Sequence, residues 1–201
     1  MQISRAVRAF FLLLTLSAAL PLAGCGVNNI PNYQQQAKAA WAQVLNQYQR
    51  RADLVPNLVA TVKGAANFET KTLEAVVEAR AKVGQTQLPP DILTNQQALQ
   101  TFEQNQAGLT SALSRLLVVV EQYPDLKANA NFQTLQAQLE GTENRIAVAR
   151  RDYIEAVRVY NTELKTFPGR IWAMLIYSDY KEMAQFTADE KALTAPTVNF
   201  N

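Results

Sequence analysis

The chain has 201 residues, enough for one domain and an N-terminal targeting segment, with 19 Lys and Arg residues against 17 Asp and Glu residues. Two of the basic residues, Arg5 and Arg8, lie in the first 24 residues, which contain no acid, so the rest of the chain is neutral overall and offers little to the phosphates of a nucleic acid. There is no histidine, one cysteine and only 7 glycines, a composition that argues against zinc sites, histidine catalysis, disulfides and glycine-rich phosphate loops.

The N-terminal segment has the order of a bacterial export signal. Residues 1–8 carry the two arginines, residues 9–20 form a short apolar run, and the chain then reads Leu22-Ala23-Gly24-Cys25. This ending resembles a lipobox, in which the chain is cut before the cysteine and the cysteine is lipidated. We therefore expect residues 1–24 to be a signal peptide and Cys25 to be the lipid attachment site.

Two kinds of membrane anchor stay open at this point. The stretch 9–24 has 16 residues, whereas a helix needs about 20 apolar residues to span a bilayer, which favours acyl chains over an uncleaved helix. Either anchor attaches the chain to the membrane, and we expect the domain to face the periplasm. Gly26 is not the aspartate that favours inner-membrane retention in enteric bacteria. The inner and the outer membrane are both open, and residues 25–32 are predicted to be a tether before a domain of residues 33–201.

The first helix of that domain is predicted from Tyr33 onward. Apolar residues recur at steps of three and four as far as Val62, as on a helix that faces a partner, and Arg51 stands at one position where the pattern calls for an apolar side chain. Pro56 removes a backbone hydrogen bond inside this helix, which predicts a kink near Ala52.

A shorter second helix is expected after a break at residues 64–67, with Asn67 as its cap and Val83 at its end. The side chains expected to face inward are Leu73, Val76, Val77 and Val83.

The third helix follows the loop 84–91, which contains a Pro pair. Thr94 and Gln97 resemble a capping box at its start. Apolar residues then recur at helical spacing up to Val120, with Gln106 as an interruption, and Pro124 marks the end.

The last long helix is predicted for residues 131–167 because apolar side chains recur without interruption from Phe132 to Tyr160. At 1.5 Å per residue such a rod is about 55 Å long, and its single apolar seam needs partners along that length. A short apolar segment, 171–177, and a polar tail follow Pro168-Gly169. The fold class is therefore all-α: an elongated antiparallel bundle of about four long helices with a short C-terminal helix.

Two segments carry a family resemblance: residues 50–59 (RRADLVPNLV) and residues 141–151 (GTENRIAVARR). Both are similar to signatures of the LemA family of membrane-associated helical proteins, and the likeness extends over roughly residues 33–200. It implies an antiparallel helical bundle held at the membrane by its N-terminus, and it implies no activity, because no chemistry is established for the family. Many relatives carry an uncleaved N-terminal helix, so the lipobox is a departure. Further matching positions are Tyr160-Asn161, Phe167-Pro168, Pro196, Val198 and Phe200.

The same two segments hold the candidate polar site. The favoured interpretation is a network between helices, in which Asp53 and Asn57 pair with Arg145 or Arg150; the alternative is a patch that binds a partner or a ligand. A metal site that uses Glu140 and Glu143 is disfavoured because carboxylate di-metal bundles also use histidine. The candidate residues are Arg50, Arg51, Asp53, Asn57, Glu143, Asn144, Arg145, Arg150 and Arg151.

The apolar segment 171–177 has two interpretations. It is either a membrane or partner contact, since Trp and Tyr favour the boundary between water and apolar surroundings, or a plug that packs over the end of the bundle. The residues concerned are Ile171, Trp172, Leu175 and Tyr177.

We therefore expect a non-enzymatic scaffold or adaptor, anchored to a bacterial membrane, that acts on envelope proteins through protein–protein contacts, with no cofactor and no nucleic acid. The alternative is an enzyme or small-ligand sensor that uses the Arg, Asp and Glu residues between the first and last helices. A membrane-remodelling bundle is a third hypothesis, which requires segment 171–177 to expose an apolar face.

Overall fold

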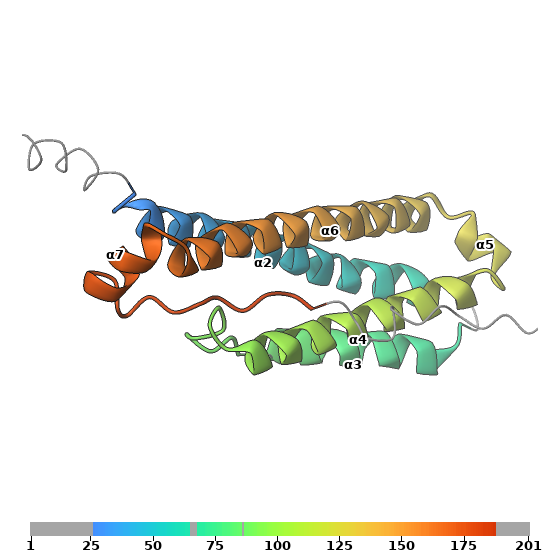
Figure 1. Ribbon diagram of the computed structural model, residues 1–201. Helices are drawn as coiled ribbons and strands as arrows, with labels where there is room; N and C mark the ends of the chain where they lie inside the picture. Colours follow the sequence, from blue (N-terminus) through green and yellow to red (C-terminus); the bar gives the residue numbers. More distant parts are fainter. Residues whose placement is uncertain (1–25, 65–67, 86, 188–201) are drawn as a thin grey trace, which may run out of the picture.

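A computed structural model describes residues 26–64, 68–85 and 87–187 of the chain, and over these ranges it contains helices and no strands (Figure 1). The all-α prediction is therefore confirmed. The helices are α2 (Asn29–Lys63), α3 (Thr70–Gln85), α4 (Gln96–Val120), α5 (Pro124–Lys127), α6 (Ala130–Lys165) and α7 (Gly169–Leu175).

The long helices form an elongated antiparallel bundle. Helix α2 packs along α6, and α3 packs along α4, so the bundle consists of two helical pairs that lie side by side (Figure 1). Each long helix runs opposite to the one before it. The short helices mark the two ends: α5 connects α4 to α6 at one end, and α7 follows α6 at the other, where α2 begins.

The core has two parts along the bundle. The part nearer α7 is rich in aromatic residues, where Trp41 lies 5.3 Å from Phe102 and 5.4 Å from Tyr153 between ring centroids. Burial raises the pKa of the Tyr153 phenol well above its usual range. The part nearer α5 is mainly aliphatic, and its side chains include Val55, Leu58, Val62, Leu109, Leu113, Leu116 and Val120.

Residues 178–187, here named the C-terminal segment, form a turn and coil without helix or strand. They nevertheless join the two helical pairs. The Asn161 side chain on α6 both donates to and accepts from the backbone of Met183, each at 2.9 Å. Ala184 N–H donates to the Leu93 carbonyl just before α4 at 2.7 Å, and the Phe186 ring packs on Tyr153. This part of the chain was expected to be a polar tail, and that expectation is wrong because its backbone bonds and buried side chains belong to the core.

Several helix boundaries differ from those predicted. Helix α2 begins at Asn29 rather than Tyr33, since Ile30 is already fully buried. The N-cap of α4 is Asn95 and not Thr94: the Asn95 side chain accepts from Ala98 N–H at 3.1 Å. Val77, expected to face inward, is 49% exposed. The predicted Asn67 cap lies outside the described residues.

Pro56 lies inside an unbroken α2, and the structure shows why this is tolerated. A proline has no N–H, so the carbonyl of Ala52, four residues earlier, loses its partner within the helix. The Arg80 side chain on α3 donates to that carbonyl through Nε at 3.1 Å. The proline thereby provides an acceptor that attaches α3 to α2.

We predict that the C-terminal segment stabilises the bundle mainly through Phe186. Phe186 is 7% exposed, and a buried Phe→Ala change costs about 3–5 kcal/mol. Phe186→Ala should therefore lower the free energy of unfolding by an amount in that range, measured by urea denaturation of the full-length protein. The matched control is Phe167→Ala, since Phe167 is 81% exposed; equal losses in the two variants would contradict this role.

Candidate functional site

Arg51 is the most deeply buried charged group of the described chain, with an exposed fraction of 1%. Its Nη1 donates to Thr110 Oγ1 at 2.6 Å and to Glu143 Oε1 at 2.7 Å. Its Nη2 donates to Gln106, to the side-chain Oε1 at 2.7 Å and to the backbone carbonyl at 3.1 Å. One side chain on α2 thus holds two residues of α4 and one of α6.

Arg150 forms a second junction, about two turns along α6 toward α7. Its Nη2 donates to Glu103 Oε1 on α4 at 2.7 Å, and its Nη1 donates to the Tyr48 hydroxyl on α2 at 3.1 Å. Its guanidinium also lies 4.1 Å from the ring centroid of Phe186 in the C-terminal segment. Burial lowers the pKa of Arg150, but the hydrogen bond to Tyr48 and the charge of Glu103 outweigh it and raise the pKa above its usual value.

A groove of about 670 Å³ runs between α4 and α6 over these two arginines. Polar atoms of both junctions reach it, and side chains such as Ala107, Ala147 and Ile154 supply an apolar lining. Glu143 supplies the carboxylate of the Arg51 junction, and its side chain is 44% exposed. The groove has the size of a small-molecule site, but the terminal nitrogens of Arg51 and Arg150 already donate to residues of the bundle. Arg151 also lines the groove, and its side chain is exposed.

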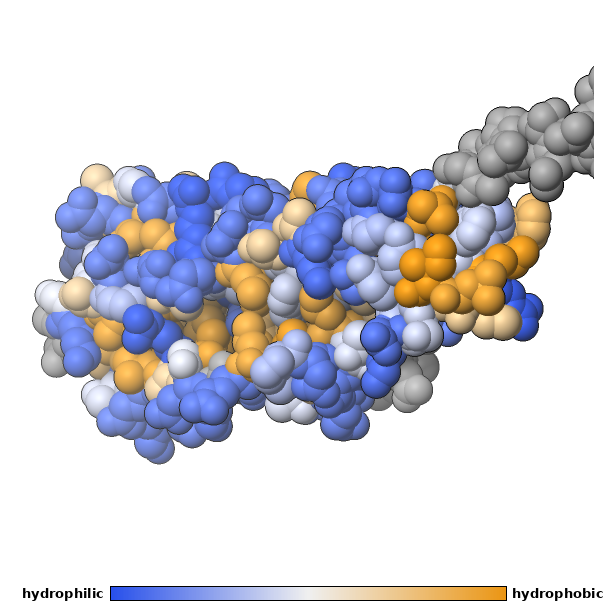
Figure 2. Space-filling view, turned by 90° about the vertical axis from the view of Figure 1, so that its left-hand side faces the viewer, coloured by the Kyte–Doolittle hydropathy of each residue, from blue (hydrophilic) through white to orange (hydrophobic). Residues whose placement is uncertain are grey.

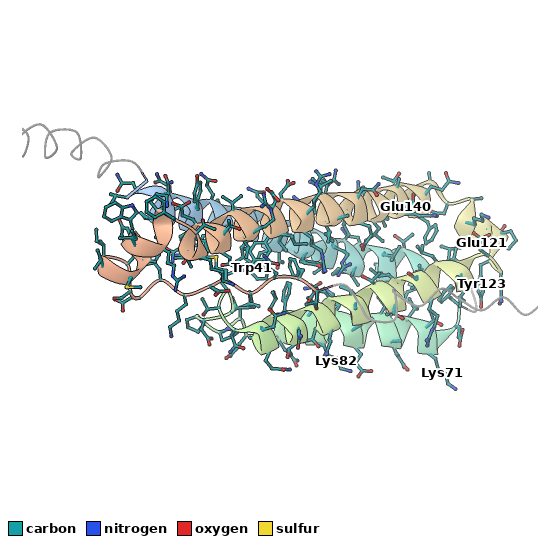
Figure 3. The ribbon with its side chains drawn as sticks, in the orientation of Figure 1. Trp41, Lys71, Lys82, Glu121, Tyr123 and Glu140 are labelled. Atoms are coloured by element: carbon teal, nitrogen blue, oxygen red, sulfur yellow. The ribbon has the colours of Figure 1, made fainter. Side chains whose placement is uncertain are left out.

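The charged side chains labelled in Figure 3 lie on the outside of the bundle. Lys71, Lys82, Glu121 and Glu140 are exposed and point away from the bundle, whereas Trp41 points inward (Figure 3). Glu140 accepts from Gln136 on its own helix at 3.0 Å and does not join Glu143 in a site. Among the described residues, no group of three or more His, Cys, Asp or Glu side chains is arranged to hold a metal ion.

Four of the nine candidate residues line the groove, and three of these four belong to the junctions; Arg151 is the fourth. Arg51, Glu143 and Arg150 belong to the two junctions. The predicted pairing of Asp53 and Asn57 with Arg145 or Arg150 is wrong. Asp53 is exposed and accepts from Gln49 on its own helix at 2.8 Å. The other exposed candidates are Arg50, Asn57, Asn144, Arg145 and Arg151.

Sequence reasoning missed the partners that α4 provides, Glu103 and Thr110. A usable signal was present, because Arg51 and Gln106 are the two polar residues that interrupt otherwise apolar seams, and these two side chains bind each other. Two unmatched polar positions on facing helices are expected to pair, since an unpaired buried polar group is costly.

The apolar candidates 171–177 separate into two groups. Trp172 and Tyr177 turn toward the bundle and pack against its aromatic core. Ile171 and Leu175 face outward, with exposed fractions of 43% and 71%. The inward side chains fit the interpretation of a plug over the end of the bundle. The outward side chains leave the membrane or partner contact as a prediction.

Residues 40–200 match the LemA family. The protein belongs to this family. The two segments that carried the resemblance in the sequence, 50–59 and 141–151, are the segments that supply Arg51, Glu143 and Arg150 to the junctions.

The chain is also similar to magnetosome proteins. It is 32% identical over 91 residues to magnetosome proteins MamQ 2 and MamQ 1 of Paramagnetospirillum magneticum, a match that covers 45% of this chain and 32% of each relative. It is 31% identical over 68 residues to magnetosome protein MamQ of Magnetospirillum gryphiswaldense, covering 34% of this chain and 25% of that relative. The match spans about a third or less of these proteins. Over the helices that the structure describes, none is long and apolar enough to cross a bilayer.

We predict that the Arg51 junction is a main source of stability in the middle of the bundle. Arg51→Ala removes the donor to the buried side-chain oxygen of Gln106 and opens a cavity, which should lower the free energy of unfolding by about 3 kcal/mol. Arg50→Ala is the matched control, because Arg50 is exposed and such changes usually stay within about 0.5 kcal/mol. The double variant Arg51→Met with Gln106→Leu, which replaces both polar partners, should recover much of the loss. Urea denaturation of the purified full-length protein measures all three, and a neutral Arg51→Ala would contradict the prediction.

Proposed function

We propose that this LemA family member is a membrane-attached helical scaffold that acts through protein–protein contacts in the bacterial envelope. In this proposal the chain is held by a lipid on Cys25 and faces the periplasm. Family membership and the likeness to magnetosome proteins suggest a membrane-associated protein, and the export pattern that ends at Cys25 supports the finer assignment.

The observation that carries the scaffold proposal is the use of the buried charges. Four acceptors surround the two terminal nitrogens of Arg51, and Arg150 is bound by Glu103 and Tyr48. These groups join helices, and a catalytic role would require at least one of them to be available to a substrate. Their arrangement supports a structural element whose outer surface is the part available to partners.

A small-ligand sensor is the second candidate, and the groove of about 670 Å³ is the observation in its favour. A ligand that binds the Arg51 donors would have to compete with Thr110, Gln106 and Glu143, at a cost comparable to breaking the junction. This competition favours the scaffold.

We predict that the native protein extracted from membranes has the mass of residues 25–201 plus acyl chains. Cys25→Ala should lose both the cleavage and the acyl mass, because the thiol is the attachment point. Intact-mass spectrometry of the two proteins measures this directly. A mass of all 201 residues without lipid in the native protein would show that an uncleaved helix is the anchor.

We also predict contacts with envelope proteins at the exposed face of the helical pairs. A photo-crosslinking amino acid at Val77 on α3 or Val118 on α4, which are 49% and 69% exposed, should give discrete crosslinked products in intact cells. The control is the same amino acid at Leu116, a fully buried neighbour on α4, which should give none. If a scan of exposed positions along all four long helices yields no product, the scaffold proposal fails.

A further inference from the structure

The end of the bundle at α7 exposes an unusual group of large apolar side chains, here named the α7 apolar end. Large apolar side chains are usually buried, whereas the side chains at this end have high exposed fractions. Figure 2 looks onto the end of the molecule where α7 lies and shows hydrophobic surface gathered there. The α7 apolar end consists of Phe167 (81%), Ile171 (43%), Met174 (69%), Leu175 (71%) and Ile176 (56%).

The two faces of α7 differ because of its sequence. Ile171, Met174 and Leu175 are spaced three and four apart and share the outer face, while Trp172 and Ala173 pack against the core. Gly169 fixes this orientation: a Cβ atom at this position would clash with the Glu163 carbonyl oxygen, so only glycine lets α7 approach α6 so closely. The outer face has no apolar partner in the part of the chain that the structure describes.

The same end of the bundle is where the N-terminal segment joins it. A Cβ atom on Gly26 would lie 3.5 Å from Pro168 Cγ, next to the start of α7. Asn29 Nδ2 at the start of α2 donates to Glu163 Oε1 at 3.1 Å, which ties α2 to the end of α6. The 25 residues before Gly26, including the apolar run and Cys25, are therefore connected to the bundle beside the α7 apolar end.

We infer that the α7 apolar end inserts into the interfacial region of the lipid bilayer to which the N-terminus is attached. This inference rests on the membrane attachment proposed above and adds a second contact with the same membrane. Seven residues make a helix about 10 Å long, too short to span a bilayer but suited to lie in its interface, where apolar faces are buried by roughly 5–10 Å.

Tethering explains how so small a patch suffices. A helix of this length would bind a membrane weakly from solution. The anchor keeps it close to the lipid, so the translational entropy of association is lost once, when the anchor binds, and not again on insertion. Burial of each large apolar side chain then favours the inserted state. The bundle would stand on the membrane by its α7 end, with α5 and the C-terminal end of α2 directed away from it (Figure 1).

The charges around the patch indicate that the contact is apolar rather than electrostatic. Basic and acidic residues near α7 are equal in number, and one pair, Lys165 with Glu182, is joined at 2.7 Å. The contact should therefore be little affected by salt or by anionic lipid. The charged residues concerned are Arg170, Lys165 and Lys181 against Glu163, Asp179 and Glu182.

The test uses the full-length protein extracted with its native anchor and reconstituted into vesicles of phosphatidylethanolamine and phosphatidylglycerol. An environment-sensitive nitrobenzoxadiazole label is attached at Met174→Cys, with Leu175→Cys as a second position. The control is Val118→Cys, because Val118 has the same exposed fraction as Met174, 69%, but lies on α4 toward the opposite end. Intact mass establishes that each protein carries one label at the introduced cysteine, and circular dichroism establishes that it is folded.

The label at 174 or 175 should shift its emission to the blue and be quenched about twofold or more by nitroxide lipids, since it would lie at interfacial depth. The label at 118 should show neither effect. A protein that floats with the vesicles but is not quenched at 174 and 175 overturns this inference and leaves membrane attachment intact. A blue shift without quenching by nitroxide lipid means that a second copy or another protein covers the patch, which also overturns it. A protein that does not float overturns the proposed attachment and this inference together.

Discussion

The bundle depends on a single buried cation. Removing the Arg51 guanidinium from water costs several kcal/mol, and only closely placed acceptors offset this cost. Gln106, Thr110 and Glu143 supply them at 2.6–3.1 Å. Because a shift of α4 or α6 along the bundle axis by one turn would move these acceptors about 5 Å from the guanidinium, the junction sets the relative height of three helices. The apolar clusters on either side of it tolerate many arrangements and do not impose that register by themselves.

The helices were predictable because their signals are local. Seams spaced three and four apart identified α2, α4 and α6 and the all-α class. The pairing between helices was not predictable in the same way: Arg51 and Gln106 are 55 residues apart, and their meeting depends on the rotation of each helix. Successive residues on a helix are about 100° apart around its axis, so choosing Asp53 instead of Arg51 as the inward charge selects the opposite face.

The C-terminal segment was missed for a different physical reason. Its hydrogen bonds use the backbone groups of Met183 and Ala184, and a backbone group is present whatever the residue type. Its buried side chains, Phe186 among them, follow no helical or strand spacing and so give no pattern to detect. Arg80 is a similar case, since its acceptor on Ala52 exists only because Pro56 lacks an N–H. A proline inside a helical pattern predicts a free carbonyl four residues earlier, and a basic side chain on a neighbouring helix is a natural donor to it.

These features together give the molecule a long axis with distinct ends. Helix α2 runs unbroken for 35 residues, about 50 Å at 1.5 Å per residue, from the point where the N-terminal segment joins it to the connection with α3. The junctions of Arg51 and Arg150 brace the middle of this length against sliding, and the C-terminal segment joins the two helical pairs near α7. Because the bundle is braced, fixing one end to a surface holds the other end at a defined distance from that surface. The guanidinium groups of Arg51 and Arg150 each join α2, α4 and α6, and this bracing is what the scaffold proposed above requires.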